Sequence, residues 1–146
     1  MFGNFNRNLD DKNRVIIPSK LRLQFDDVCF MTQDLDNVVS IRNESDFGIW
    51  SQNLLDLNEF SREARLLRRA MLGRTHKLEI DKQGRIKVES SIMETSGLTK
   101  EVVFVGVGNK VEIHSKENYT NMQEEFKDAG SLSDLADKLL KEGAKL

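Results

Sequence analysis

Two short stretches of the sequence place an arginine four positions after an aspartate. The first is Asp10-Asp11-Lys12-Asn13-Arg14, and the second, 71 positions later, is Asp81-Lys82-Gln83-Gly84-Arg85. The carboxylate can accept backbone N–H groups of its own turn and can pair with the guanidinium. The guanidinium can instead bind a phosphate or the edge of a guanine. We therefore expect Arg14 and Arg85 to contact nucleic acid, and a purely structural clamp between strands is the alternative.

The residue before each arginine indicates the shape of the turn. Asn13 and Gly84 occupy the same position of the repeat, and asparagine and glycine are the residues that most readily accept a positive φ. We expect a left-handed residue at both positions. Asp10, Asn13, Asp81 and Gly84 are thus predicted to shape the turns, while the arginines face the partner.

Further basic residues surround the two turns. Lys12, Lys82 and Arg7 are candidates for contacts with DNA phosphates, although ordinary solvated surface is the alternative for each of them. A second basic group follows in the middle of the chain, and helical spacing would align most of its members on one face. These residues could bind phosphate or pair with an acidic neighbouring subunit, and they are Arg62, Arg65, Arg68, Arg69 and Arg74.

The charge of the chain is segregated along the sequence. The formal net charge of all 146 residues is −2, yet residues 1–23 carry +3 and residues 61–87 carry +6, while residues 24–60 carry −7. The two positive blocks contain the two turns. A local basic patch suffices to attract phosphate when acidic surface faces elsewhere. The small net charge therefore does not exclude nucleic acid as a partner.

The sequence favours neither catalysis nor a cofactor. His76, His114 and the single cysteine, Cys29, lack the spacing of metal ligands. No Ser/His/Asp or Cys/His set indicates a nucleophile. Gly106-Val107-Gly108 precedes a strand pattern, so a tight hairpin is expected in place of a nucleotide loop. We expect no enzyme, no metal, no cofactor and no small-molecule substrate.

The segments around each turn predict the same series of elements twice. Each unit reads strand, turn, strand, short helix, strand, hairpin, strand, and Val102–Val105 is matched with Val28–Met31 after a three-residue insertion. Helical spacing follows each unit, and Ser115 and Ser131 are the expected caps of two C-terminal helices. We expect one compact domain, 1–146. It would comprise repeats 1–47 and 75–115, a helical connection 48–74 and C-terminal helices 116–146.

Several spaced motifs together resemble the MraZ family, which belongs to the wider AbrB-like (SpoVT/AbrB) superfamily. They are the doubled Asp-x-x-x-Arg, Leu9-Asp10 leading to Arg14-Val15-Ile16-Ile17-Pro18, Arg68-Arg69-Ala70-Met71-Leu72-Gly73, and Gly97-Leu98-Thr99-Lys100-Glu101-Val102. The resemblance covers residues 1 to about 142. One departure is Asn13, where the family turn commonly has glycine. The resemblance implies an α+β fold with a mainly β core, a pseudo-two-fold swapped-hairpin β barrel built from two internal repeats, with flanking helices.

The resemblance also implies a function. It implies a sequence-specific DNA-binding transcriptional regulator that acts on double-stranded promoter repeats upstream of the division and cell-wall gene cluster. It further implies a ring-shaped, octamer-like homo-oligomer. The alternative is a ring-shaped scaffold or protein-interaction module whose contact with nucleic acid is only non-specific.

The hydropathy of the chain bears on its location. The longest apolar runs, Val28–Met31 and Val102–Val105, are far shorter than the roughly 20 residues of a membrane span. The N-terminal residues lack the basic and apolar regions of a secretory signal. We expect a cytoplasmic, nucleoid-associated protein without membrane contact.

Overall fold

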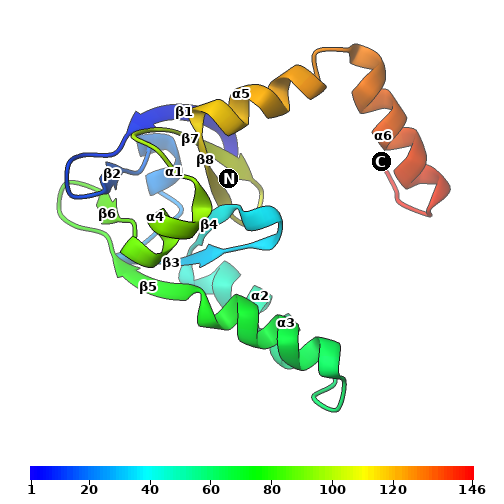
Figure 1. Cartoon of the computed structure of the whole chain (residues 1–146), viewed down its shortest axis with the longest axis horizontal. Coiled ribbons are helices and arrows are strands. Elements are labelled where there is room, and N and C mark those ends of the chain that lie inside the picture. Colours follow the sequence, from blue (N-terminus) through cyan, green and yellow to red (C-terminus); the bar gives the residue numbers. More distant parts are fainter. The chain divides into compact units, whose positions relative to one another are not determined.

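The structure is a computed structural model that describes residues 1–146, apart from the side chain of Ala129. The chain divides into two compact units, residues 1–115 and residues 116–146 (Figure 1). The expected α+β class, a mainly antiparallel β core with flanking helices, is confirmed. That residues 1–146 act as a single domain stays a prediction, as do the boundaries drawn at residues 47 and 74.

The first unit repeats one series of elements. In the first copy these are β1 (Phe2–Asn8), β2 (Arg14–Ile16), α1 (Ser19–Arg22), β3 (Val28–Gln33), the 3-10 helix η1 (Leu35–Asn37) and β4 (Val39–Arg42). In the second copy they are β5 (Thr75–Glu79), β6 (Arg85–Lys87), α4 (Ser90–Ser96), β7 (Glu101–Val107) and β8 (Val111–Ser115). Between the copies lie α2 (Glu44–Leu55) and α3 (Arg62–Gly73).

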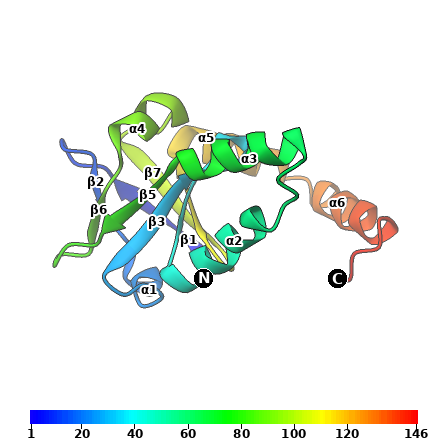
Figure 2. The same cartoon turned by 90° about the horizontal axis from the view of Figure 1, so that it is seen from below.

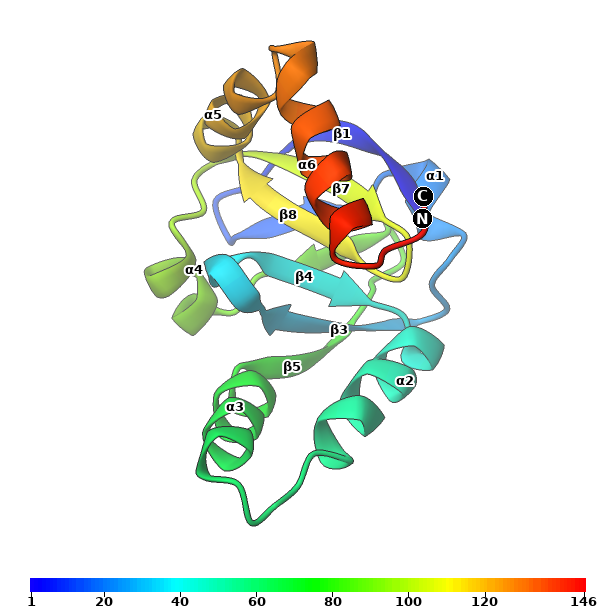
Figure 3. The same ribbon diagram turned by 90° about the vertical axis from the view of Figure 1, so that its right-hand side faces the viewer.

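Six of the strands form one antiparallel sheet in the order β1-β7-β8-β4-β3-β5, which Figure 3 shows from top to bottom. Within residues 1–115 this sheet is open, with β1 and β5 at its edges, so it differs from the closed barrel that the family resemblance implied. The remaining strands, β2 and β6, are three residues long and pair with each other. The two strands end at equivalent positions, Ile16 and Lys87, although only the first is followed by a proline, Pro18.

The pairing of strands gives the unit an approximate two-fold symmetry. Strand β1 of the first repeat pairs with β7 of the second, and β5 of the second pairs with β3 of the first, so the repeats exchange strands. Residues in equivalent positions pair across the symmetry axis: Val15 with Ile86, 71 positions apart, and Ser40 with Glu112, 72 apart. The two repeats therefore fold as one interlocked body.

The registers correct one detail of the expected repeat. Phe5 pairs with Phe104, and His76, 71 positions after Phe5, pairs with Met31. Phe104 is thus the equivalent of Met31. The match between the two repeats in the sequence predicts Val105 at that position. The insertion before β7 is two residues long, one fewer than expected. The continuous apolar run Val102–Val105 has no alternation from which its register could be read.

Side chains from equivalent positions fill the core between the sheet and the β2–β6 ladder. Val15 and Ile86 on the ladder are each 1% exposed, and Leu21 of α1 and Ile92 of α4 are each 2% exposed. Burial of one such side chain contributes about 1.5–3 kcal/mol. Because alternate side chains of a strand face opposite sides, the neighbours of Val15 and Ile86 face away from this core.

Helices α2 and α3 connect the two copies and pack beside β3 (Figure 3). Asn43 caps α2 by accepting the N–H of Asp46 at 2.8 Å, and the ring of Phe47 stacks on Phe30 with centroids 4.1 Å apart. Arg68 on α3 donates to the carbonyl oxygens of Leu54 at 3.1 Å and Leu57 at 2.7 Å. This arginine of the basic group therefore fixes the end of α2.

The second unit consists of α5 (Lys116–Glu125) and α6 (Ala129–Lys141). Helix α6 begins two residues before the expected cap, Ser131, because the carboxylate of Asp128 accepts the N–H of Gly130 at 3.0 Å. Aspartate caps a helix as well as serine does, so Gly130 lies inside the helix that it was expected to precede. Among the described residues, none of the helices combines the length and the apolar character of a membrane span.

Candidate nucleic-acid interface

The first turn is held together by the side chain of Asp10. Its Oδ1 accepts the backbone N–H of Lys12 at 2.9 Å and that of Arg14 at 2.8 Å. The main chain closes the same turn, since the N–H of Asn13 donates to the carbonyl of Asp10 at 3.0 Å and the N–H of Asp10 donates to that of Arg14 at 2.8 Å. The shape of the turn thus depends on Asp10 and on backbone groups.

The second turn has the same geometry. Oδ1 of Asp81 accepts the N–H groups of Gln83 and Arg85, each at 2.9 Å. The N–H of Gly84 donates to the carbonyl of Asp81 at 2.9 Å. Two turns of different composition therefore adopt one conformation, and both lie on the same side of the unit, beside the β2–β6 ladder (Figures 1 and 2).

The left-handed residues join the two repeats. Asn13 has φ 59° and Gly84 has φ 78°, as the residue types led us to expect. The carbonyl of Asn13 accepts the N–H of Val88, and the carbonyl of Gly84 accepts the N–H of Ile17, both at 2.9 Å. Positive φ at these positions directs each carbonyl to the other repeat, so the turns are fixed to each other as well as within themselves.

Each aspartate also holds the arginine of its turn. Nε of Arg14 lies 2.8 Å from Oδ2 of Asp10, and Nε of Arg85 lies 2.8 Å from Oδ2 of Asp81. The arginine side chains are 33% and 27% exposed. Within the described part of the chain, the terminal amino groups of these two arginines make no hydrogen bond, so the clamp orients each guanidinium while its outer donors stay available to a partner.

The pKa values of the two aspartates reflect this geometry. The backbone N–H of each turn's arginine has the largest influence and lowers the pKa of Asp10 and of Asp81. Burial opposes this shift, while the guanidinium and the second backbone N–H reinforce it. Both carboxylates are therefore ionised near neutral pH and keep their arginines in place.

The outward face of the β2–β6 ladder carries the arginines. Arg14 pairs with Lys87, and Ile16 pairs with Arg85, on either side of the buried pair Val15–Ile86. Directly opposed residues lie about 5 Å apart and residues two apart on one strand about 7 Å. The backbone positions of these three cationic residues therefore lie within a span smaller than the 12 Å width of the major groove of DNA.

The other expected contact residues are placed unequally. Lys12 and Lys82 are exposed in the two turns, but they are not equivalent, since the position of Lys12 is taken by Gln83 in the second repeat. Arg7 lies on the edge strand β1, opposite Val102, and outside the turn that begins at Asp10. Its Nη1 donates to the carbonyl of Asn6 at 2.7 Å. The structure thus groups Lys12 and Lys82 with the turns and leaves Arg7 apart.

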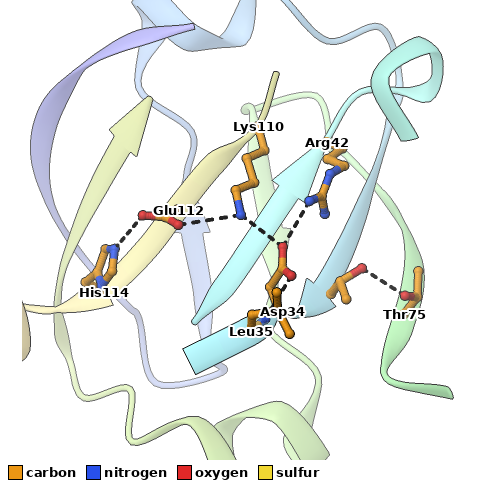
Figure 4. A network of polar contacts seen from close by, with 8 residues as sticks. Asp34, Leu35, Arg42, Thr75, Lys110, Glu112 and His114 are labelled. Carbon is orange, nitrogen blue, oxygen red and sulfur yellow. Dashed lines mark hydrogen bonds and ion pairs between the residues drawn. The ribbon is translucent and has the colours of Figure 1, made fainter. Parts of the chain in front are cut away.

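A buried network of charges was not foreseen from the sequence. Oδ2 of Asp34 accepts Nη2 of Arg42 at 2.9 Å and Nζ of Lys110 at 3.0 Å, and Glu112 contacts both Lys110, at 3.6 Å, and His114, at 3.1 Å (Figure 4). The side chain of Arg42 is 3% exposed. The network joins β4 to β8 at the symmetry axis, on the face of the sheet opposite to the apolar core.

The surroundings lower the pKa values of the two carboxylates in this network, Asp34 and Glu112. Burial is the largest influence on Asp34 and raises its pKa, but hydrogen bonds from Leu35, Lys110 and Arg42 together bring the pKa below its ordinary value. The hydrogen bond with His114 is the main cause of the lowered pKa of Glu112. The guanidinium carbon of Arg42 lies 4.1 Å from the ring centre of Trp50. The sequence feature that indicates this network is Arg42, the single basic residue within the acidic block 24–60.

The structure assigns no other chemistry to the described residues. Among them, no group of three His, Cys, Asp or Glu side chains could hold a metal ion. Cys29 is fully buried, and burial raises the pKa of its thiol to about 12. A thiol of that kind is unreactive at neutral pH.

One family of known proteins matches each half of the chain separately, in agreement with the doubled fold. The sequence profile of the family described as "MraZ protein, putative antitoxin-like" matches residues 1–70 and again residues 71–142. The chain belongs to the MraZ family. The family resemblance carried by the doubled turns and the spaced motifs is therefore confirmed.

Relatives in the MraZ family match nearly the whole chain, and the three that follow are each named Transcriptional regulator MraZ. That of Mycoplasmopsis pulmonis is 36% identical over 143 residues, which are 98% of this chain and 97% of the relative. That of Ureaplasma urealyticum is 36% identical over 143 residues, 97% of both chains. That of Mesoplasma florum is 35% identical over 128 residues, 87% of this chain and 88% of the relative.

Proposed function

We propose that the protein is a sequence-specific DNA-binding regulator of transcription that contacts DNA through its two Asp-Arg turns. Membership of a family whose relatives are named transcriptional regulators supports the role in transcription. The observation that carries the DNA contact is the pairing of β2 with β6, which brings two turns of identical geometry onto one outward face.

In this proposal the aspartate and the arginine of each turn have different roles. Asp10 and Asp81 hold the loops and orient the guanidinium groups through Nε. The outer donors of Arg14 and Arg85 bind phosphate oxygens or the acceptor atoms of a guanine. Lys12, Lys82 and Lys87 add phosphate contacts that increase affinity without reading sequence. The clamp and the DNA contact are thus parts of one arrangement.

We further propose that several copies act together. Copies of the chain would form a ring-shaped, octamer-like homo-oligomer that presents successive turns to successive promoter repeats upstream of the division and cell-wall gene cluster. Binding at linked sites raises the overall affinity by a factor of about 10²–10⁴ over one site. The regulator would then be nucleoid-associated in the cytoplasm. The proposal includes no catalytic step.

One observation favours the alternative of a protein-interaction scaffold. Four leucines of α6 are each about half exposed and could serve as contacts for another protein, namely Leu132, Leu135, Leu139 and Leu140. In that case DNA binding would rest on charge alone and would not depend on base sequence.

A gel-shift comparison at near-physiological salt separates these two functions. The probes are the upstream duplex and a scrambled duplex of equal length and composition. Specific recognition predicts that the upstream duplex binds at least about a hundredfold more tightly, because specific sites commonly exceed non-specific DNA by 10³ or more. Equal affinities for the two duplexes would contradict the regulator and support the scaffold.

A further inference from the structure

The two halves of the β2–β6 ladder differ at one outward position. Ile16 in the first repeat and Lys87 in the second are 71 positions apart and therefore equivalent. Ile16 is 52% exposed, while its neighbours Val15 and Ile17 are each 1% exposed. The core beneath the ladder is filled by those neighbours, so Ile16 exposes a branched apolar side chain that the packing of the unit does not require.

The surroundings of Ile16 are basic. Arg85 lies directly opposite Ile16 in the ladder, Arg14 is two residues before it on the same strand face, and Lys87 lies across from Arg14. An apolar protein surface placed on Ile16 would remove the outer guanidinium donors of Arg14 and Arg85 and the ammonium of Lys87 from water without giving them acceptors, which is costly. The major groove of DNA instead offers an apolar group beside acceptor atoms and phosphates, since thymine carries a C5 methyl.

We propose that Ile16 is a specificity-determining residue that contacts the C5 methyl of a thymine in the major groove, next to the base or phosphate bound by Arg85. This inference rests on the proposed DNA-binding function and extends it to one base. A two-stranded β ribbon fits the major groove, and Ile16 is on the face of the ribbon that carries the arginines.

The difference between Ile16 and its equivalent Lys87 gives the DNA contact a direction. Where the first repeat offers the methyl-binding Ile16, the second offers Lys87, a donor suited to a phosphate or a guanine acceptor. The turns differ as well: Asp11 is equivalent to Lys82 and Lys12 to Gln83, so the second turn carries one more positive charge at these two positions. One subunit therefore reads an asymmetric sequence in a fixed orientation, although its fold is nearly symmetric.

The test uses DNA that the protein itself selects. A duplex is enriched from a random-sequence pool by the full-length protein, and each thymine of the enriched site is replaced in turn by deoxyuridine, which lacks only the C5 methyl. Affinities are measured for the wild type and for Ile16→Ala. The matched control is Leu23→Ala, which removes an 85% exposed apolar side chain outside the ladder.

The expected result is one thymine whose replacement weakens wild-type binding about threefold to fivefold, as the loss of one buried methyl group predicts. The same change from thymine to deoxyuridine should weaken binding by the Leu23→Ala variant by the same factor. The Ile16→Ala variant should bind the thymine and deoxyuridine duplexes with equal affinity. A uracil penalty that persists in Ile16→Ala, or the absence of any penalty in the wild type, would overturn the role of Ile16 alone. Failure of the pool to yield any enriched sequence would overturn the proposed function with it.

A second variant tests the direction of the contact. Ile16→Lys makes the two outward faces of the ladder alike, and because Ile16 is exposed the change leaves the core intact, which an unchanged urea midpoint would verify. Selection with this variant should lose the preference for thymine at the position identified by uracil scanning. Retention of that preference would contradict the inference.

Discussion

At the scale of single residues, the turns depend on the type of side chain at two positions. Aspartate at the first position binds two backbone N–H groups and one guanidinium, and Asn13 and Gly84 accept the left-handed backbone that directs a carbonyl to the other repeat. Both features could be predicted from the sequence because they are local. The asymmetry at Ile16 and Lys87 became visible only when the register showed which face of the ladder they share.

The ionised aspartates predict a loss of stability in acid. The pKa of Asp10 and Asp81 is lower in the folded chain than the value of about 3.9 expected after unfolding. Stability from these groups is therefore fully present above that value and is lost as the pH falls through the folded pKa.

The measurement is the urea midpoint between pH 6 and pH 3. In the wild type it should fall more steeply with acid than in the double variant Asp10→Asn with Asp81→Asn, whose amides cannot titrate. The remaining slope of the double variant would come from Asp34 and Glu112, whose pKa values are also lowered. Identical slopes for the two proteins would show that the turn carboxylates are not preferentially ionised in the folded state.

At the scale of elements, the repeat, the turns and the helical connection were predictable, while long-range relations were not. The continuous apolar run before Gly106 concealed the register of β7, and the three-residue strands β2 and β6 pair with each other where a closed barrel was expected. The charge network was missed because a charged residue in a strand is usually exposed. Arg42 is buried at a place where Asp34, which follows β3, and Trp50 on α2 both contact it.

The buried network predicts a large effect of Arg42→Met on stability. Removal of the guanidinium leaves the buried carboxylate of Asp34 with Lys110 as its cationic partner, so we expect a loss near the lower end of the roughly 3–5 kcal/mol that breaking a buried ion pair costs. The matched control is Lys77→Met, an exposed position on the edge strand β5, where the ammonium lies 6.0 Å from the ring centre of Phe30.

The free energy of unfolding is measured by urea titration followed by circular dichroism. The control should change it by less than about 1 kcal/mol, as is usual for an exposed charge. Equal small losses in the two variants would mean that the network is not important for the stability of the sheet.

At the scale of the whole molecule, duplication within one chain accounts for the proposed interface. Neither repeat alone forms the ladder, because β2 pairs only with β6 and each turn is tied to the opposite repeat through the carbonyl of Asn13 or Gly84. The positive block 1–23 lies in the first repeat and the positive block 61–87 runs from α3 into the second repeat, and each block contains one of the two turns. A chain with a net charge of −2 can thereby carry a local basic surface. The net charge of the whole chain does not reveal this surface.

The affinities of Arg14→Ala and Arg85→Ala for the enriched duplex test most directly whether both turns contact DNA together. Each turn should survive the change because its backbone hydrogen bonds to the aspartate do not involve the arginine side chain. Lys141→Ala, on the exposed surface of α6, is the control. We predict that each arginine variant loses at least about tenfold in affinity with an unchanged oligomer mass, while the control binds like the wild type. Wild-type affinity in either arginine variant would contradict the account.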